Sequence, residues 1–476
     1  MSSRSATRQS DSAGNASSES LAGALLITVD SLRADAVTPT TAPTMTALGD
    51  RGTRFESALA HGNWTPFSFP SILSGDPVFA GDDDIGLTDE PTLAETLRDA
   101  GVATAGFNDA NGFLTEHWGY DRGFEEFEPF MTTADGGRYA RYLAAHPTVQ
   151  GWLRFAGGPF GRAVDRLRPG GTSSRVPDVE QRAMAFLEET DAPFFLWVHY
   201  MDAHTPYIPA PKHVRAVSGD RVGALRMLRA HVHTGLGLEV SDGTLRRLRT
   251  LYDAAVHQID ASIERLLSAL DEQGLREETL VVLAGDHGEE FQEHGHLAHY
   301  PKLYKELVHV PLVVAHPDAE SRVVDDAVGL DVVPPTVCES MGVPVPPGFD
   351  GESVLDVVVD GAEVDEEPVV SVAVRGDTVT QQPIPRSLGE GELLVSARTA
   401  AWSYVRHTES GDRELFHRET DPAERENVLE DHPDVAAALD GAVERRIDAI
   451  GTAGEGDGPT EVPDEVAGRL EVLGYR

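Results

Sequence analysis

The segment GDHGEEFQEHGHLAH, residues 285–299, gathers side chains that can bind metals and transfer protons. Thirteen consecutive residues hold four of the chain's 18 histidines: His287, His294, His296 and His299. Imidazoles bind divalent cations and titrate near neutral pH, and Asp286 adds a carboxylate directly before the first of them. Gly288 is expected to let the chain turn sharply. The simpler alternative is a solvated histidine-rich loop.

Two lysines follow this segment closely. Lys302 and Lys305 lie just beyond it, and Lys212 is the one other lysine in the chain. Such a position favours contact with an anionic substrate.

A carboxylate also follows an apolar run near the N-terminus. Residues 24–29, ALLITV, are typical of a strand buried on both faces. An ionised Asp30 after such a strand would be costly without a counter-charge, so a bound cation is expected beside it. The alternative is that Asp30 caps a short helix formed by SLRAD.

Hydroxyl side chains are concentrated in HGNWTPFSFPSILSG, residues 61–75. Thr65, Ser68 and Ser71 lie ahead of ILSG, in a segment that could open a helix. Hydroxyls in such Ser/Pro turns usually act as caps, but in the right context one of them could be a nucleophile.

Three apolar runs end in acidic or imidazole side chains. They are residues 24–30, ALLITVD; residues 194–204, FFLWVHYMDAH; and residues 280–287, LVVLAGDH. Open parallel sheets bind ligands beyond the carboxyl ends of their strands. The three endings are therefore expected to converge on one crevice.

Helical patterns separate these runs. In residues 91–101, Pro91 fits the first turn of a helix and Gly101 its end. A longer helix after Asp242 should end before Gly274. Its buried stripe would consist of Leu248, Leu251, Ala255, Ile259, Ile263, Leu266 and Leu270. The alternation of strand and helix predicts an α/β fold.

Changes in composition predict the domain limits. Residues 1–20 are polar and Ser-rich, as in a flexible tail, and residues 21–367 would form the main domain. Within it, residues from about 130 to 176 are interpreted as an insertion or a mobile cover over the site. Residues 368–476 would form a C-terminal subdomain with short strands (VVSVAV, LLVSART and AWSYVRH), a flexible linker at GTAGEGDGPTE and a terminal helix.

The chain is strongly acidic. Its 476 residues include 79 acidic and 39 basic side chains, a formal net charge of −40. This charge argues against nucleic acid or an anionic membrane as a partner. Because the acids are spread along the chain and lysine is rare, we interpret the composition as adaptation to a high-salt interior, where ions screen self-repulsion. A mesophilic acidic protein is the alternative.

The single cysteine, Cys338, excludes an internal disulfide and fits a reducing compartment. No run approaches the roughly 18 apolar residues of a membrane-spanning helix, and the N-terminal stretch is unlike a signal peptide. A cytoplasmic location is therefore expected.

Six segments, taken in order, resemble the sulfatase family of the alkaline-phosphatase-like superfamily, in a form typical of halophilic archaea. The likeness runs from Leu25 to about Leu429. It is carried by LLITVDSLRADAV, ALAHGNWTPFSFPSILSG, HYMDAHTPY, LAGDHGEEFQEHGH with LYKELVHVPLVV, DVVPPTVCESMGVPVPPGFDGESVL and ELFHRETDPAERENVLEDHP. The resemblance implies an alkaline-phosphatase-like fold, with a mostly parallel central sheet, helices on both faces and a small C-terminal α+β subdomain.

The same resemblance implies roles for single residues. Asp30, Asp286 and His287 would be metal ligands. Anchoring the nucleophile segment on its closing ILSG puts Thr65 at the nucleophile position, also beside the metal, with Ser68 as the second choice. The cation would bind the ester oxygen, lower the pKa of the nucleophile and offset the charge that develops on the transferred group.

Three further residues would contact the substrate. His204 would bind it or donate a proton, and His299 stands where the family often has a substrate-contacting lysine. Lys302 is the other candidate for that contact. His204 and His299 would assist the leaving alkoxide.

The sequence departs from the family pattern at several positions. The family's C/S-x-P-S-R motif, whose first residue is oxidised to formylglycine, is TPFSF here, with Thr65 first and Phe69 in place of arginine. Threonine cannot give the aldehyde, which argues against formylglycine. The usual paired aspartates appear as Asp30 and Ser31, and the usual Asp-Asn pair as Asp286 and His287. Fewer carboxylates and an imidazole shift the expected metal from calcium alone towards manganese, zinc or magnesium, so that the divalent cation is expected to be one of these four.

These features predict a metal-dependent hydrolase of sulfuric or phosphoric esters, acting on a small-molecule or glycan ester. A plain hydroxyl nucleophile suits phosphate mono- or diesters. A phosphodiesterase or phosphoglycerol-type transferase on the same fold is the alternative. A metal-binding protein that kept the fold but lost catalysis is a lesser one.

Overall fold

The structure is a computed structural model. It describes residues 20–80, 84–88, 90–109, 111–130, 176–190, 193–205, 207–219, 240–365, 367–376 and 387–452. The predicted N-terminal tail, the insertion at about 130–176 and the linker near residue 451 lie almost wholly outside these ranges.

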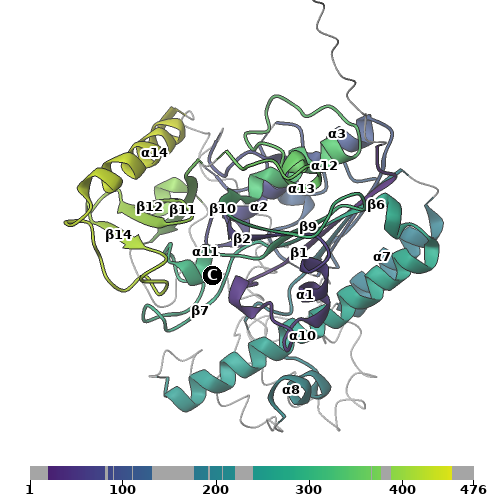
Figure 1. Ribbon diagram of the computed structural model, residues 1–476, viewed down its shortest axis with the longest axis horizontal. Helices are drawn as coiled ribbons and strands as arrows, with labels where there is room; N and C mark the ends of the chain where they lie inside the picture. The colour runs from purple at the N-terminus through teal and green to yellow at the C-terminus, as the bar shows by residue number, and fades with distance from the viewer. Residues whose placement is uncertain are drawn as a thin grey trace, which may run out of the picture.

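Within the described ranges, an eight-stranded sheet forms the centre of the molecule, in the order β10-β2-β9-β6-β1-β5-β3-β4 (Figure 1). Its strands are β1 Gly23–Val29, β2 Thr53–Leu59, β3 Ala103–Asn108, β4 Glu126–Glu128, β5 Phe194–Tyr200, β6 Thr279–Gly285, β9 Leu312–Ala315 and β10 Arg322–Gly329. Strand β9 is antiparallel to β2 and β6, whereas the other neighbours are parallel. This arrangement confirms the predicted α/β fold with a mostly parallel sheet.

The three strands that were expected to share an edge are adjacent and in register. Strand β1 lies between β6 and β5, and its last residue, Val29, is aligned with Gly285 and Tyr200. Asp30 and Asp286 follow their strands directly. Both carboxylates therefore leave the sheet at the same edge.

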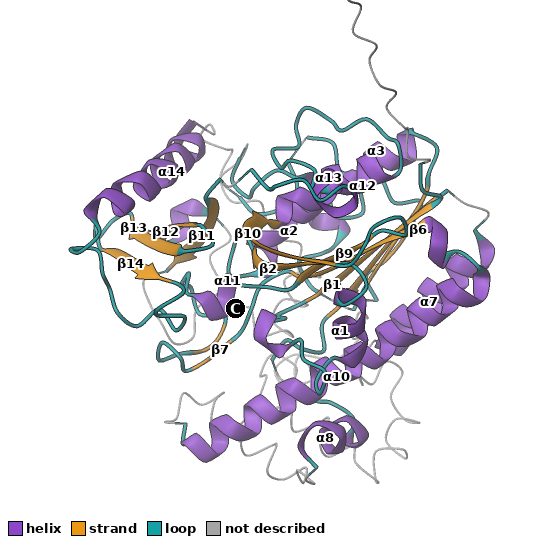
Figure 2. Ribbon diagram, viewed as in Figure 1, coloured by secondary structure: helices purple, strands orange, loops and turns teal. Residues whose placement is uncertain are grey.

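Helices cover both faces of the sheet (Figure 2). On one side are α2 Thr65–Ser74, α3 Leu93–Asp99, α12 Val333–Ser340 and α13 Leu355–Val359; on the other are α1 Pro43–Gly49, α7 Val176–Glu189 and α10 Asp242–Gln273, with α8 Pro211–Ser218 against α10. Strand β1 places Ala24 and Leu26 in the first of these layers and Leu25, Ile27 and Val29 in the second. Burial on both faces explains why the run is continuously apolar.

Two helices test the predicted helix limits. Helix α10 ends before Gly274, which has a φ of 73°, and all seven residues of the predicted stripe are buried. Helix α3 starts later than predicted. Thr92 is its N-cap and forms a capping box with Glu95, so Pro91 precedes the helix instead of lying in its first turn.

The C-terminal part of the chain forms a second, antiparallel sheet, with α14 Pro433–Thr452 packed against it (Figure 1). It consists of β11 Val369–Arg375, β12 Glu392–Arg398, β13 Trp402–His407 and β14 Arg413–His417. Strand β14 was not expected, because RELFH has only a short apolar centre. The backbone N–H of Val372 donates to the carbonyl of His61 (2.8 Å), so this sheet supports the segment that leads to Thr65.

The remaining elements are short. They are the hairpin strands β7 Glu290–Phe291 and β8 Leu297–Ala298, helix α11 Lys305–Val308, and the 3-10 helices η1 Ala34–Ala36, η2 Glu116–Trp118, η4 Arg276–Glu278, η5 Leu330–Val332 and η6 Leu388–Glu390.

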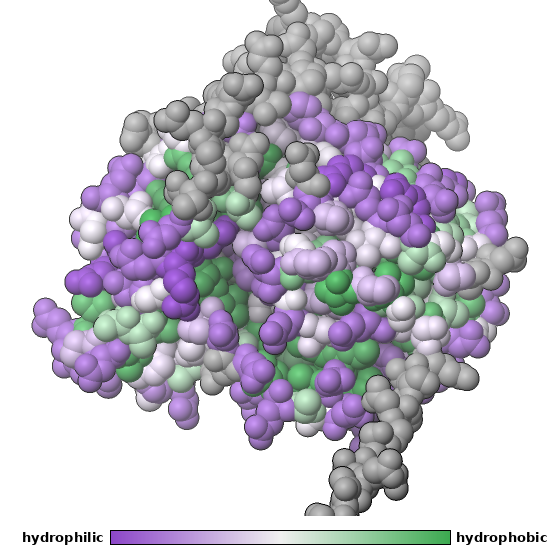
Figure 3. Space-filling model, turned by 90° about the horizontal axis from the view of Figure 1, so that it is seen from above, coloured by the Kyte–Doolittle hydropathy of each residue, from purple (hydrophilic) through white to green (hydrophobic). Residues whose placement is uncertain are grey.

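Hydrophilic residues are spread over the coloured part of the face shown in Figure 3, with apolar areas between them. Of the large hydrophobic side chains in the described ranges, only Val323 is exposed. None of the described helices has the length and apolar character needed to cross a membrane.

Candidate active site

Asp30 lies at the centre of the site. Its carboxylate is fully buried and accepts hydrogen bonds from Ser31 Oγ (2.9 Å), Thr65 Oγ1 (3.1 Å) and Asn111 Nδ2 (2.9 Å). The short helix that follows has Arg33 as its N-cap. The alternative interpretation of Asp30 as a helix cap is therefore wrong.

Asp286 and His287 face Asp30 from the end of β6. Nε2 of His287 lies 3.8 Å from Oδ1 of Asp30 and 3.7 Å from Oδ2 of Asp286. Nδ1–H of His287 donates to the carbonyl of Gly288 (2.9 Å), so Nε2 is the ring nitrogen that faces the two carboxylates. A hydrogen bond at one nitrogen commonly orients an imidazole to bind a metal through the other.

Gly288 serves a different purpose from the predicted one. It is absent from the glycines with positive φ, so no left-handed turn requires it. A Cβ at this position would lie 2.0 Å from the carbonyl oxygen of Glu306. Glycine is needed here because α11 packs directly on the backbone.

Thr65 and Ser68 differ in what they face. Thr65 is the first residue of α2, and its hydroxyl lies 3.1 Å from Asp30 Oδ2 and 3.4 Å from His287 Nε2. Ser68 instead donates its hydroxyl proton to the backbone carbonyl of Asp286 (2.5 Å). The hydroxyl of Thr65 is thus directed into the carboxylate cluster, while that of Ser68 positions the chain around Asp286.

Two residues of the cluster were missed by the sequence analysis. Asn111 donates to Asp30 and lies 3.4 Å from Thr65 Oγ1. His199 on β5 is fully buried, and its Nε2 lies 3.9 Å from Asp30 Oδ2. The signal for His199 was present, since an imidazole in the otherwise apolar run FFLWVHY is unusual. No comparable signal marks Asn111.

His204 and His299 lie beside the cluster. Their rings are 5.0 Å apart, and the ring of His299 is 5.2 Å from that of His287. Nδ1 of His299 lies 3.4 Å from the buried carboxylate of Glu289. The three imidazoles therefore form a row beside Asp30.

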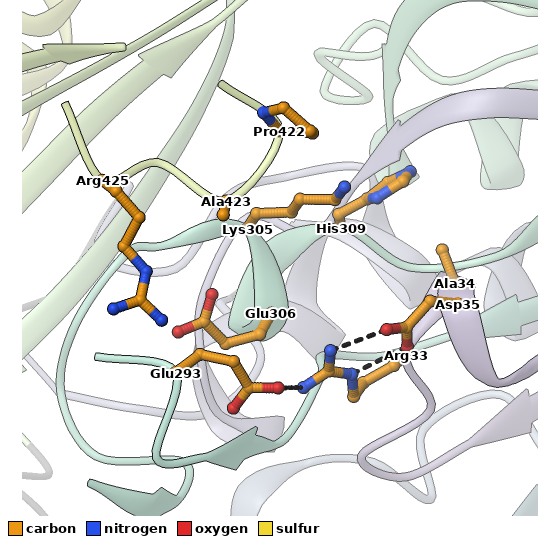
Figure 4. A pocket seen from close by; sticks show the side chains of 10 residues that line it. All are labelled: Arg33, Ala34, Asp35, Glu293, Lys305, Glu306, His309, Pro422, Ala423 and Arg425. Atoms are coloured by element: carbon orange, nitrogen blue, oxygen red, sulfur yellow. Dashed lines mark hydrogen bonds and ion pairs between the residues drawn. The ribbon is translucent and has the colours of Figure 1, made fainter. Parts of the chain in front are cut away.

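Lys302 and Lys305 contact groups outside the Asp30 cluster. The ammonium group of Lys302 lies 3.5 Å from Glu290 and donates to the carbonyl of His294. Lys305 lines a separate hollow of about 180 Å³, where α11 meets the loop that includes Pro422 (Figure 4). Neither lysine has a described contact with the Asp30 cluster.

His294 and His296 lie on the β7–β8 hairpin. The ring of His294 stacks on Tyr304 with centroids 3.7 Å apart, and that of His296 stacks on Tyr300 at 3.9 Å. Nδ1 of His294 is 2.6 Å from a carboxylate oxygen of Glu306. These two histidines hold the hairpin in place.

Electrostatics at the cluster favour a bound cation. Burial opposes ionisation of Asp30, but the imidazoles around it, His204 and His287 foremost, lower its pKa below the usual range. Burial raises the pKa of Asp286 despite the opposing effect of His287, and the charge of Asp30 adds to the rise. Burial lowers the pKa of His199 to about 4. Two buried carboxyl groups that resist joint ionisation are suited to a counter-charge of +2 between them.

The donor atoms also fit a divalent cation. Ligand atoms of Asp30, His199 and Asp286 all lie within 4.8 Å of one another. Oδ2 of Asp286 and Nε2 of His199 are buried and have no hydrogen-bond partner among the described residues. Buried polar atoms are rarely left unpaired, so their clustering favours a metal ligand set.

The chain is similar to several characterised proteins. It is 28% identical over 234 residues to the multifunctional alkaline phosphatase superfamily protein PehA of Trinickia caryophylli. This match covers 41% of this chain and 45% of that protein. It is 25% identical over 203 residues to arylsulfatase K of Mus musculus, a match that covers 42% of this chain and 36% of that protein. The chain thus spans less than half the length of these relatives.

Solved structures share the fold over most of the chain. The phosphonate monoester hydrolase of Agrobacterium radiobacter superposes with a TM-score of 0.67 and 19% identity, covering 91% of this chain and 96% of that one. BT4656, solved with its substrate D-glucosamine-2-N,6-O-disulfate, superposes with a TM-score of 0.66 and 16% identity. This superposition covers 92% of this chain and 100% of that one. The sulfatase family model matches residues 24–343, and the chain belongs to the sulfatase family.

Proposed function

We propose that this protein is a metal-dependent hydrolase of sulfuric or phosphoric esters in which Thr65 is the nucleophile. The observation that carries the proposal is the position of the Thr65 hydroxyl, at the start of α2 and 3.1 Å from Asp30. Ser68, the second choice, has its proton engaged by the carbonyl of Asp286. Asp30, Asp286 and His287 would hold the cation, with Thr65 beside them.

A bound cation would lower the pKa of a nearby hydroxyl and offset charge on the transferred group. The hydroxyl of Thr65 would give up its proton along its hydrogen bond to Asp30 as its oxygen attacks the phosphorus or sulfur atom, and the ester's alkoxide would leave. His204 and His299, in the row beside the cluster, would supply the proton that the alkoxide takes up. Water would then hydrolyse the threonine ester and restore the hydroxyl.

The nucleophile favours phosphoric or phosphonic esters over sulfuric ones. Threonine cannot be oxidised to an aldehyde, so formylglycine chemistry is not available at position 65. Phe69 is fully buried and packs edge-on against His199 with ring centroids 5.0 Å apart, in the place where the family motif has arginine. The likeness to a phosphonate monoester hydrolase supports the same preference.

The substrate is proposed to be a small-molecule or glycan ester. BT4656 takes a disulfated glucosamine, and similarity to it supports a sugar ester as one class to test. The net charge of −40 supports a high-salt cytoplasm as the place of action, because dissolved ions would screen the acidic surface from an anionic substrate.

Kinetics of matched variants tests the proposal. Aryl phosphate, aryl phosphonate and aryl sulfate are compared as substrates for the wild type, Thr65→Ala, Thr65→Ser and Ser68→Ala. Loss of the nucleophile should lower kcat by about a thousandfold or more, and Thr65→Ser should retain part of the activity. Ser71→Ala is the control, because the buried Ser71 hydroxyl on the same helix has no partner among the described residues.

The outcome separates the alternatives. Activity of Thr65→Ala within tenfold of the wild type, with Ser68→Ala inactive, would reassign the nucleophile to Ser68. Transfer of the phosphoryl group to glycerol in preference to water would favour the transferase. No metal-dependent turnover of any of the three esters would favour a protein that kept the fold without catalysis.

A further inference from the structure

His199 is a buried imidazole in which one ring nitrogen is hydrogen-bonded to another described residue and the other is not. It lies one residue before the end of β5, opposite Thr28 of β1, and is completely buried. Nδ1 is 3.0 Å from the hydroxyl oxygen of Thr28. Nε2 has no hydrogen-bond partner among the described residues and lies 3.9 Å from Asp30 Oδ2. That separation is too long for a hydrogen bond.

Thr28 engages one of the two ring nitrogens of His199. Its hydroxyl oxygen accepts a hydrogen bond from Trp197 Nε1 (2.9 Å) and lies 3.0 Å from Nδ1 of His199, while the carbonyl of Val198 is more distant, at 3.5 Å. This contact fixes the ring so that Nε2 is the nitrogen that faces Asp30.

Nε2 of His199 and Oδ2 of Asp286 are both buried and both lack a hydrogen-bond partner among the described residues. One ligand atom from each of Asp30, His199 and Asp286 lies within 4.8 Å of the other two. A cation among them would give the two unpartnered atoms a common partner.

The imidazole is also held in this orientation. Phe69 packs edge-on against it, at 88° between the ring planes, and Trp197 lies 6.3 Å away on the same strand. Metal-bound histidines are commonly fixed by a hydrogen bond at the second nitrogen and by packing of the ring. Thr28 and Phe69 provide both.

We propose that His199 is a further ligand of the metal, so that the cation is held by two carboxylates and two imidazoles: Asp30, Asp286, His199 and His287. Such a mixed nitrogen and oxygen set selects a transition-series divalent cation such as zinc, manganese or cobalt over calcium, which favours oxygen ligands. The inference rests on the proposed metal-dependent function and specifies the metal class and one more ligand.

The experiment measures metal binding by the full chain, independently of turnover. After removal of metals with a chelator, binding of Zn²⁺ and Ca²⁺ is followed by calorimetry for the wild type, His199→Gln and His316→Gln. His316 is a matched control because it is a buried histidine that follows β9, which is antiparallel to β6, so it lies at the opposite edge of the sheet.

His199→Gln should weaken Zn²⁺ binding at least tenfold while leaving Ca²⁺ binding within about twofold, and His316→Gln should change neither. X-ray absorption spectroscopy of the zinc-loaded wild type should show two imidazoles at the metal, falling to one in His199→Gln. If His199→Gln does not fold, the number of imidazoles in the wild-type spectrum tests the proposal. Two imidazoles support it, and one contradicts it.

Failure of the inference differs from failure of the proposed function. A wild-type spectrum with one imidazole, which is lost in His287→Gln, would overturn the role of His199 and leave the metal site intact. Absence of any divalent-cation binding by the wild type would overturn both.

Discussion

The hydroxyl of Thr65 donates a 3.1 Å hydrogen bond to the carboxylate of Asp30, although the two residues are 35 positions apart. Asp30 directly follows the central strand β1, and Thr65 begins helix α2. The start of a helix and the end of a parallel strand therefore meet at one edge of the sheet. The bond links the candidate nucleophile to the candidate metal ligand.

Asn111 supports both members of this pair. Its side-chain N–H group donates to Asp30 Oδ2 (2.9 Å) and lies 3.4 Å from Thr65 Oγ1. Asn111→Ala should lower kcat/KM by about tenfold to a hundredfold, since a hydrogen bond to a charged group contributes roughly 1.5–3 kcal/mol. Asn111→Asp should lower it further by adding a third carboxylate.

The matched control for Asn111 is Asn427. Its carbonyl oxygen accepts from the backbone N–H of Leu415 (3.1 Å) in the C-terminal sheet. Asn427→Ala should lower the unfolding temperature but leave kcat/KM nearly unchanged. Equal losses of activity in the two alanine variants would contradict a specific role for Asn111.

Phe69 is a core residue in place of the family's arginine. Its ring is fully buried and contacts Trp197 at 5.6 Å and Tyr120 at 6.1 Å between centroids. Phe69→Ala should reduce the free energy of unfolding by about 3–5 kcal/mol because it leaves a cavity. Phe69→Leu should cost less, and Phe69→Arg should be the most damaging because it buries an unpaired charge. Chemical denaturation measures all three, and a stable Phe69→Arg variant would show that the motif could be restored.

His294 should contribute a pH-dependent stabilisation. Nδ1–H donates to Glu306 (2.6 Å) and Nε2–H to the carbonyl of Glu424 (3.0 Å), so the ring is protonated. Partial burial opposes this charge, but the bonds to Glu306 and Glu424 raise the pKa of His294 above its ordinary value of 6.5. Because the folded pKa is the higher one, the stabilisation is complete below pH 6.5 and is lost as the pH rises through the folded value.

The measurement is the difference in unfolding free energy between the wild type and His294→Gln as a function of pH. The difference should be largest in mildly acidic solution and shrink as the pH rises. His296→Gln is the control, because burial lowers the pKa of His296 and its replacement should not reproduce this loss. A difference for His294→Gln that grows with pH would contradict the proposed bonding.

Salt should stabilise the folded chain. With a net charge of −40, self-repulsion is strong at physiological ionic strength, where the screening length is about 8 Å, and weaker at 1 M salt, where it is about 3 Å. The unfolding temperature should rise steeply over this range in KCl, and less in an uncharged osmolyte of equal osmolality. An unfolding temperature that does not respond to KCl would refute the interpretation as adaptation to high salt.

The parts of the fold that could be predicted depend on local patterns. The apolar runs that end at Asp30 and Asp286 identified central strands, and the spacing of apolar residues after Asp242 identified α10. Because parallel strands share an edge, the meeting of Asp30 with Asp286 and His287 could be predicted as well.

The parts that could not be predicted depend on contacts between distant segments. An imidazole in the apolar run FFLWVHY marks His199 as unusual, but its position beside Asp30 depends on the register in which β5 pairs with β1, and no local pattern specifies that register. Asn111 reaches Asp30 from the loop after β3. The glycine at position 288 is required by the backbone of Glu306, which is not its neighbour in sequence.

The most direct measurement is mass spectrometry of the peptide that contains Thr65 and Ser68, after acid quenching of the metal-loaded enzyme during turnover of an aryl phosphate or aryl sulfate. A phosphoryl or sulfuryl group on Thr65, absent from Thr65→Ala, is the predicted result. An adduct on Ser68, or the loss of two hydrogens at Ser68 that marks formylglycine, would contradict it.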